Sequence, residues 1–113
     1  MVRKYVPDRG DLICLDLEPQ SGHEQKGLRP ALVLSPKSYN QKTSLAILCP
    51  ITNKEKGYPF EVKLTQNVPV TGVILSDQIK SLDWKARNAK FICKLDVDVI
   101  DEVLGKIKAL IDV

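Results

Sequence analysis

The stretch I-D-E-V-L-G-K-I-K-A-L-I, from Ile100 to Ile111, decides the fold of this chain because it carries a helical repeat. Its apolar residues recur at the i, i+3, i+4, i+7 spacing of one helix face. They are Ile100, Val103, Leu104, Ile107, Leu110 and Ile111. Asp96 or Asp98 can cap the start of this helix. Gly105 costs roughly 1 kcal/mol relative to alanine, and a close approach to a sheet would explain it.

The segments before this helix are predicted to be strands separated by polar turns. The expected strands are Leu12–Leu17, Pro30–Ser35, Leu45–Ile51, Phe60–Leu64, Val73–Leu75 and Lys90–Leu95, with a polar turn or short helix at Lys37–Lys42. Pro30–Ser35 is nearly all apolar, which predicts burial on both faces. Pro50 indicates a bulge or a paired edge. Strands followed by one helix predict an α+β fold: a strongly bent antiparallel sheet or small barrel with a C-terminal helix packed on it.

The composition fits one soluble domain over residues 1–113, with 43% hydrophobic and 27% charged residues. No apolar run approaches the roughly 20 residues that cross a bilayer, and no apolar segment follows Arg3 and Lys4 as in a secretory signal. The three cysteines are widely spaced and the chain has one histidine, so we expect reduced thiols and neither a metal nor a cofactor. These features predict a cytoplasmic protein without a membrane segment.

Positive charge is concentrated in the body of the chain. Residues 1–95 carry 15 Lys and Arg against 9 Asp and Glu, whereas residues 96–113 carry 2 against 5. A basic body favours a polyanion or an acidic protein as partner, although it also fits an ordinary solvated surface.

The polar stretch G-H-E-Q-K-G-L-R-P, Gly22–Pro30, is the best candidate for a chemical site. The carboxylate of Glu24 can take a proton from a hydroxyl nucleophile, and the guanidinium of Arg29 can bind a phosphate and stabilise charge that builds on it. Together they suffice for phosphoester cleavage without metal when RNA supplies its own 2′-hydroxyl. The alternative is a surface ion pair at the entry of a strand.

Further residues could complete such a site. His23 titrates near neutral pH and could be a second acid or base, or an ordinary surface residue. Thr52, at the end of a predicted strand, could hold a phosphate oxygen. Lysines and arginines further along could contact phosphates, and Tyr58, Phe60 and Trp84 could stack on bases, although packing is the default role of aromatic side chains. The residues that we assign to RNA binding are Gln25, Asn53, Lys54, Lys56, Asp77, Gln78, Lys80, Ser81 and Arg87.

Five motifs in order resemble the MazF/PemK/Kid family of toxin endoribonucleases, or mRNA interferases. They are G-H-E-Q-K-G-L-R-P (Gly22–Pro30), P-A-L-V-L-S-P (Pro30–Pro36), K-G-Y-P-F-E-V (Lys56–Val62), D-Q-I-K-S-L-D-W-K-A-R (Asp77–Arg87) and V-L-G-K-I (Val103–Ile107). The resemblance covers the chain from about Tyr5 to Ile111.

This resemblance implies an SH3-like barrel shared with the gyrase toxin CcdB, and a homodimer. It also implies the toxin of a type II toxin–antitoxin system, which cleaves single-stranded RNA at a short sequence without metal. The partner would be an acidic, MazE-like antitoxin. Glu24, Arg29 and Thr52 match catalytic positions of the family, and His23 and Asp77 match positions used in the Kid branch. Leu75 stands where that branch has an arginine, so the Kid-type set is incomplete.

Two other functions fit the same fold. One is a CcdB-like inhibitor that poisons its target without catalysis, but that mode depends on a C-terminal Trp-Gly-Ile, and this chain ends in Leu-Ile-Asp-Val. The other is a catalytically silent barrel that binds RNA or a protein partner, against which the Glu24 and Arg29 pair argues.

Overall fold

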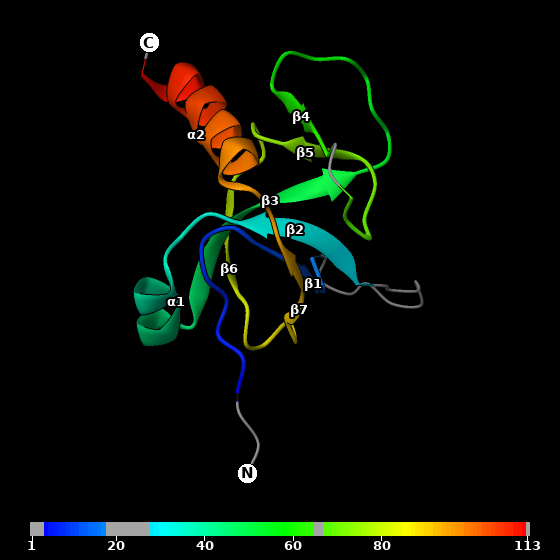
Figure 1. Cartoon of the computed structure of the whole chain (residues 1–113). Helices are drawn as coiled ribbons and strands as arrows, with labels where there is room; N and C mark the ends of the chain where they lie inside the picture. The colour runs from blue at the N-terminus through cyan, green and yellow to red at the C-terminus, as the bar shows by residue number, and fades with distance from the viewer. Residues whose placement is uncertain (1–3, 18–27, 65–66, 113) are drawn as a thin grey trace.

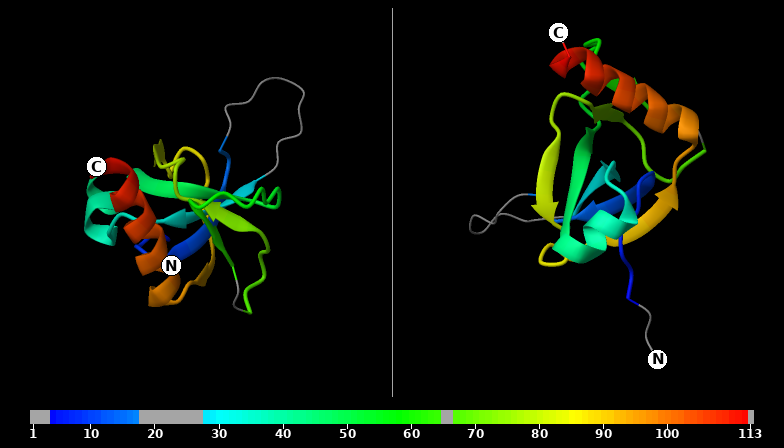
Figure 2. Two further views of the ribbon diagram at one scale, coloured as in Figure 1. Left: turned by 90° about the horizontal axis from the view of Figure 1, so that it is seen from above. Right: turned by 90° about the vertical axis from the view of Figure 1, so that its left-hand side faces the viewer.

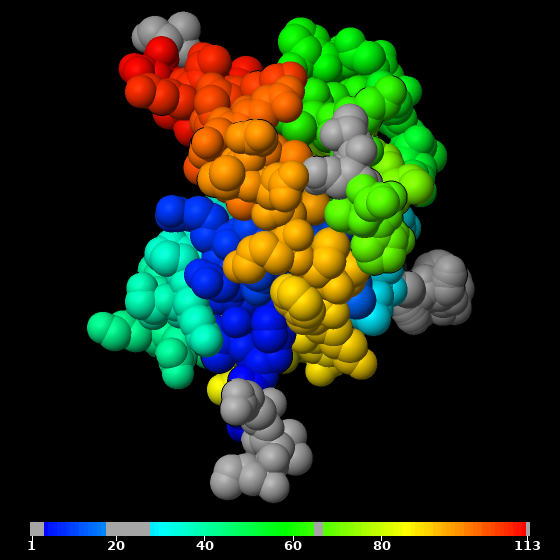
Figure 3. Space-filling model, in the orientation of Figure 1, coloured from blue at the N-terminus to red at the C-terminus, as the bar shows by residue number. Residues whose placement is uncertain are grey.

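The computed structural model describes residues 4–17, 28–64 and 67–112. Its elements are β1 (Asp11–Leu15), β2 (Arg29–Val33), α1 (Lys37–Thr43), β3 (Leu45–Thr52), β4 (Glu61–Lys63), β5 (Val73–Leu75), β6 (Lys80–Asp83), β7 (Lys90–Lys94) and α2 (Val97–Ile111). Helix α2 lies at one end of the molecule, and α1 lies at the other (Figures 1 and 2). The space-filling view shows α2, in orange and red, beside the green segment that carries β4 (Figure 3).

The strands form one antiparallel sheet in the order β4-β5-β3-β2-β1-β7, with β6 also paired to β3. The predicted α+β fold, a bent antiparallel sheet with a C-terminal helix, is therefore confirmed. The small barrel is not closed: the pairings of the described strands follow an open path from β4 to β7. The sheet bends because β3 changes its partner along its length.

Pro50 lies where β3 changes partner. One edge of β3 pairs first with β6, up to Leu48, and then with β5 from Ile51 onward. The carbonyl of Ile47 faces β2, where it accepts from the Leu34 N–H. The backbone N–H and C=O groups of successive residues in a strand point to opposite edges. The backbone of Pro50 therefore points away from β2, toward the gap between β6 and β5. A proline fits there because no ladder bond needs its missing N–H.

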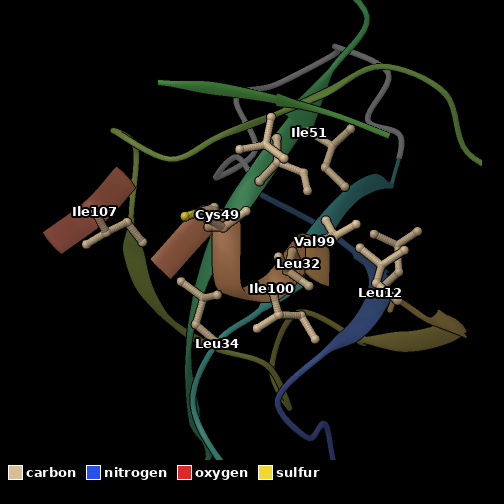
Figure 4. Close-up of a cluster of buried hydrophobic side chains, with 12 residues drawn as sticks. Leu12, Leu32, Leu34, Cys49, Ile51, Val99, Ile100 and Ile107 are labelled. Carbon is tan, nitrogen blue, oxygen red and sulfur yellow. The ribbon is translucent and has the colours of Figure 1, made fainter. Parts of the chain in front are cut away.

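The side of the sheet that faces α2 carries the first of two apolar clusters, which we call the helix cluster (Figure 4). Its buried members from the sheet include Leu12, Leu32 and Cys49. Helix α2 contributes Val99, Ile100, Val103 and Ile107. Covering the sheet in this way removes apolar surface from water, which is the main favourable contribution to folding.

A second apolar cluster, the Trp84 cluster, lies on the opposite side of the central strands. It contains Ile13, Leu15, Ala31, Val33, Ala46, Leu48 and Trp84. Alternate residues of β2 and its continuation, Ala31 and Val33 against Leu32 and Leu34, thus enter different clusters. The prediction that Pro30–Ser35 is buried on both faces is confirmed for these four residues.

The apolar stripe predicted for α2 is only partly buried. Leu104, Leu110 and Ile111 are 37%, 51% and 71% exposed, whereas Val99, outside the predicted stripe, is buried. The sheet covers only the side of α2 formed by residues 99, 100, 103 and 107. The predicted apolar stripe is wider than this contact, so its remaining residues stay exposed to solvent. The explanation offered for Gly105 is also wrong, because a Cβ atom there would meet nothing within 4 Å.

Helix α1 and the start of α2 agree with the sequence-based expectations, whereas strand β6 does not. The predicted turn or short helix at Lys37–Lys42 is helix α1, and Asp96 is the N-cap residue of α2, although its side chain makes no capping hydrogen bond. Strand β6 was not predicted. Its sequence, K-S-L-D, is short and polar, and three of its four residues are exposed. It is a strand because β3 offers it an unpaired edge.

Candidate active site

The sheet brings Arg29 and Thr52 together. Arg29 begins β2 and Thr52 ends β3, and these neighbouring strands are antiparallel with Ala31 opposite Pro50. Continuing that register by two residues places Arg29 opposite Thr52. Both line a surface hollow of about 410 Å³. Arg29 is exposed and Thr52 is half-buried, so both side chains can reach a ligand.

Three adjoining hollows share Thr52 and together form what we call the Thr52 groove. The hollow of about 410 Å³ is joined by two of about 210 Å³ each. The groove is lined by Leu17, Arg29, Pro30, Pro50, Ile51, Thr52, Asn53, Lys54, Lys56, Tyr58, Phe60, Glu61, Pro69, Val70, Thr71, Leu75, Gln78 and Lys80. A groove of this extent can hold several linked groups of an extended ligand.

The groove is basic. Arg29, Lys54, Lys56 and Lys80 are all exposed on its walls. Among the described residues, its lining contains one carboxylate, that of Glu61, which accepts hydrogen bonds from the backbone N–H groups of residues 56 and 57 at 3.1 and 3.0 Å. That carboxylate shapes the loop before β4, and four cations remain to attract phosphate groups.

The backbone around Thr52 is tightly packed. Its Oγ1 atom accepts a hydrogen bond from the Lys54 N–H at 3.1 Å, which turns the chain at the end of β3. Gly72 lies against it with a φ angle of +123°, and a Cβ atom there would stand 2.4 Å from the carbonyl oxygen of Thr52. The chain can therefore pass this close to Thr52 only with a glycine at position 72.

The other residues predicted for catalysis or RNA binding divide into three groups. Asn53, Lys54, Lys56, Gln78 and Lys80 line the Thr52 groove. Asp77 and Ser81 are exposed but do not line it, and the guanidinium of Arg87 donates to the Asp16 carbonyl at 2.7 Å. His23, Glu24 and Gln25 lie outside the described residues.

The aromatic candidates have different environments. Tyr58 and Phe60 stack on each other, with ring centroids 5.2 Å apart, at the wall of the groove, and Tyr58 is half-exposed. Trp84 is only 8% exposed, and its indole N–H donates to the Asn40 carbonyl at 2.9 Å. Trp84 therefore has the packing role that is the default for an aromatic residue.

Sequence reasoning missed the segment Pro69–Thr71, which forms one wall of the groove. A Thr-Gly pair before a strand indicates a turn, but only the pairing of β5 with β3 brings it beside Thr52. In the described part of the chain, no three His, Cys, Asp or Glu side chains gather closely enough to hold a metal ion. The same residues contain no helix long and apolar enough to cross a membrane.

The chain is thus a small α+β protein with a basic groove in which an extended polyanion can bind. An arginine and a threonine hydroxyl lie side by side in that groove. The profile of the PemK-like, MazF-like toxins of type II toxin–antitoxin systems matches residues 8–111. The chain belongs to this family of toxins, and it is an endoribonuclease like MazF and PemK of Escherichia coli.

The relatives match over nearly the full chain. The endoribonuclease toxin MazF of Escherichia coli strain K12 is 47% identical over 111 residues, covering 98% of this chain and 99% of the relative. The endoribonuclease PemK of Escherichia coli is 34% identical, covering 96% and 85%. A MazE–MazF crystal structure from Deinococcus radiodurans superimposes with a TM-score of 0.91 at 50% identity, covering 96% of this chain and 98% of that chain.

Proposed function

We propose that this toxin cuts single-stranded RNA at a short sequence, without a metal ion, by attack of the substrate's own 2′-hydroxyl. The 2′-oxygen forms a bond to the adjacent phosphorus, and the bond from phosphorus to the 5′-oxygen breaks. The products are a 2′,3′-cyclic phosphate and a 5′-hydroxyl. The reaction needs a base for the 2′-proton, a proton for the leaving oxygen and a cation for the charge on the phosphate.

The proposed roles follow from the chemistry of each side chain. Glu24 takes the proton of the 2′-hydroxyl, and His23 assists proton transfer to the leaving oxygen. Arg29 stabilises the charge that builds on the phosphate, because a guanidinium makes paired bonds to its oxygens. Thr52 holds a non-bridging oxygen of the same phosphate.

One observation carries this proposal: Arg29 and Thr52, from different strands, meet in one basic groove. They are separated by 22 residues in the sequence, and the register of β2 and β3 brings them opposite each other. Leu17, just before the segment that contains Glu24, lines the same groove. An isolated surface ion pair, the alternative interpretation, would not require a threonine and three lysines around it.

The proposal is tested with a long RNA digested in the presence of EDTA. The wild-type chain should cut, and Arg29→Ala should cut about 10²–10³-fold more slowly because it lacks the cation at the phosphate. Glu24→Ala should lose about 10²–10⁴-fold. Lys85→Ala, which lies on a separate hollow with Trp84, is the matched control and should cut normally.

Two further results would contradict the mechanism. A substrate with a single 2′-deoxy sugar at the scissile nucleotide should bind but resist cleavage, so normal cutting of it excludes attack by the 2′-oxygen. Loss of cutting in EDTA would show that a metal takes part.

We also propose that the toxin works as a homodimer in the cytoplasm. The expected need to cover Leu45–Ile51 does not support this, because most of that strand is already buried within the chain. The support comes from α2, where Val97, Leu104 and Ile111 follow each other at seven-residue intervals and are all exposed. An apolar stripe at that spacing fits the same stripe of a second copy.

The proposed protein partner is an acidic antitoxin. The MazF of Deinococcus radiodurans is crystallised with MazE, and the basic groove of this chain fits an acidic segment as well as it fits RNA. The antitoxin would then inhibit cleavage by occupying the Thr52 groove.

A further inference from the structure

The side chain of Asn53 is held in one orientation by the segment before β5. The hydroxyl of Thr71 donates a hydrogen bond of 2.9 Å to Oδ1 of Asn53. The same oxygen lies over Gly72, where a Cβ atom would come within 3.1 Å of it. Two contacts from the same segment therefore place the amide oxygen of Asn53 against residues 71 and 72.

An asparagine whose oxygen is held in this way can offer only donors to a ligand. The amide has one oxygen that accepts and one NH₂ group with two donors. Within the described parts of the chain, no residue accepts a hydrogen bond from this NH₂ group. Asn53 is exposed and lines the hollow that Arg29 and Thr52 share. Its donors are thus available beside the proposed position of the scissile phosphate.

We infer that Asn53 is a specificity-determining residue that donates a hydrogen bond to the RNA, and that Thr71 is the positioning residue that makes it a donor. The inference rests on the proposed function and assigns a task within it. The acceptor is a base oxygen or ring nitrogen of a nucleotide next to the scissile phosphate, because only a base edge carries sequence information.

Holding the Asn53 amide in one orientation gives selectivity, because an amide that turns freely can pair with a hydrogen-bond donor or with an acceptor. If the oxygen could turn outward, Asn53 would bind a base that presents a donor as readily as one that presents an acceptor. With Thr71 holding the oxygen, a base that presents a donor meets another donor and leaves both unpaired, which is costly. Single-stranded RNA is read through such edges of unstacked bases.

The test compares two substitutions at position 71. Thr71→Val keeps the shape of the side chain and removes the hydroxyl, whereas Thr71→Ser keeps the hydroxyl. For the preferred RNA site, kcat/KM should fall about 3- to 10-fold in Thr71→Val, as for the loss of a neutral hydrogen bond, and Thr71→Ser should recover most of it. Thermal melting of each variant shows that the fold is intact.

A double-mutant cycle separates positioning from a general structural effect. If Thr71 acts through Asn53, adding Thr71→Val to Asn53→Ala should cause no further loss of kcat/KM. Mapping of 5′-hydroxyl ends then identifies the acceptor. New cleavage sites in Thr71→Val support a base acceptor, whereas an equal loss at all sites shows that Asn53 contacts a phosphate and does not determine specificity.

The inference is overturned if Thr71→Val cuts the wild-type sites at the wild-type rate, or if the losses from the two positions simply add. Either result leaves RNA cleavage itself intact. Failure of the wild-type chain to cut RNA would instead refute the proposed function, so the two failures are distinguishable.

Discussion

Gly72 is the single residue on which the position of Thr52 depends most directly. Its backbone has a positive φ angle, and a methyl group there would overlap the Thr52 carbonyl oxygen. Gly72→Ala should therefore push the end of β3 away from β5 and move Thr52 relative to Arg29. We expect a loss of about 1–3 kcal/mol in the free energy of unfolding from backbone strain, and a larger one if the strands separate.

Gly57→Ala is the matched control for this prediction. Gly57 also has a positive φ angle, but a Cβ atom there would meet nothing within 4 Å. Chemical denaturation should show a smaller loss for Gly57→Ala than for Gly72→Ala. Equal losses would mean that the contact with Thr52 is not tight.

At the same scale, the residue types of the proposed site can be suggested from the sequence, whereas their arrangement cannot. Glu24, Arg29 and Thr52 are proposed because a carboxylate, a guanidinium and a hydroxyl suit phosphoester cleavage. Thr71 could not be found in this way, because its importance comes from one hydrogen bond to Asn53 across the groove. A contact between residues 18 positions apart depends on the pairing of two strands, which no local pattern reports.

At the scale of the element, α2 has two apolar surfaces with different tasks. Ile107 is buried in the helix cluster, whereas Leu104 is exposed. Ile107→Ala should cost about 2–5 kcal/mol of stability and lower the melting temperature at every protein concentration. Leu104→Ala should act only through the proposed dimer, so any effect on melting should grow weaker on dilution.

Light scattering at micromolar concentration completes this prediction. The wild-type chain should have twice the monomer mass of 12.6 kDa, and Leu104→Ala should shift the equilibrium toward monomer. A wild-type monomer would contradict the proposed dimer, and a concentration-independent loss in Leu104→Ala would show that Leu104 supports the monomer itself.

Elements with a clear repeat were predictable, and those that depend on a partner were not. The apolar run P-A-L-V-L-S predicts a buried strand, and the i, i+4 spacing of apolar residues predicts the helix α2. Both patterns are visible within the segment itself and do not depend on a partner strand. Strand β6 has no such pattern and exists only through β3. The exposed residues of α2 were misassigned for a related reason: a stripe shows which side is apolar, not how much of it the sheet covers.

At the scale of the whole molecule, charge should control access to the Thr52 groove. Each cation that contacts a phosphate releases counterions, so affinity for single-stranded RNA falls as salt rises. We expect Lys54→Gln with Lys56→Gln to reduce the slope of log affinity against log salt by about 1.4, at roughly 0.7 for each contact. Filter binding with the cleavage-deficient Glu24→Ala chain measures this slope.

Lys85→Gln tests whether the effect belongs to the groove. Lys85 lies on a different hollow and should leave the slope unchanged. An acidic peptide should compete with RNA for the groove, less effectively at high salt. If Lys85→Gln reduces the slope as much as the double variant, RNA follows the overall charge of the protein and not the Thr52 groove.

The order of the sheet also has a consequence for how the molecule is made. β1 pairs with β7, whose Lys94 stands opposite Asp11, and α2, which follows β7 in the chain, covers the helix cluster. A chain emerging from the ribosome N-terminus first has β2 and β3, with Arg29 and Thr52, well before β7 and α2 exist. The side of those strands that carries the helix cluster then stays exposed to water until α2 has been synthesised. The groove residues Arg29 and Thr52 therefore reach their final positions only after β7 and α2 have been synthesised and packed against the earlier strands.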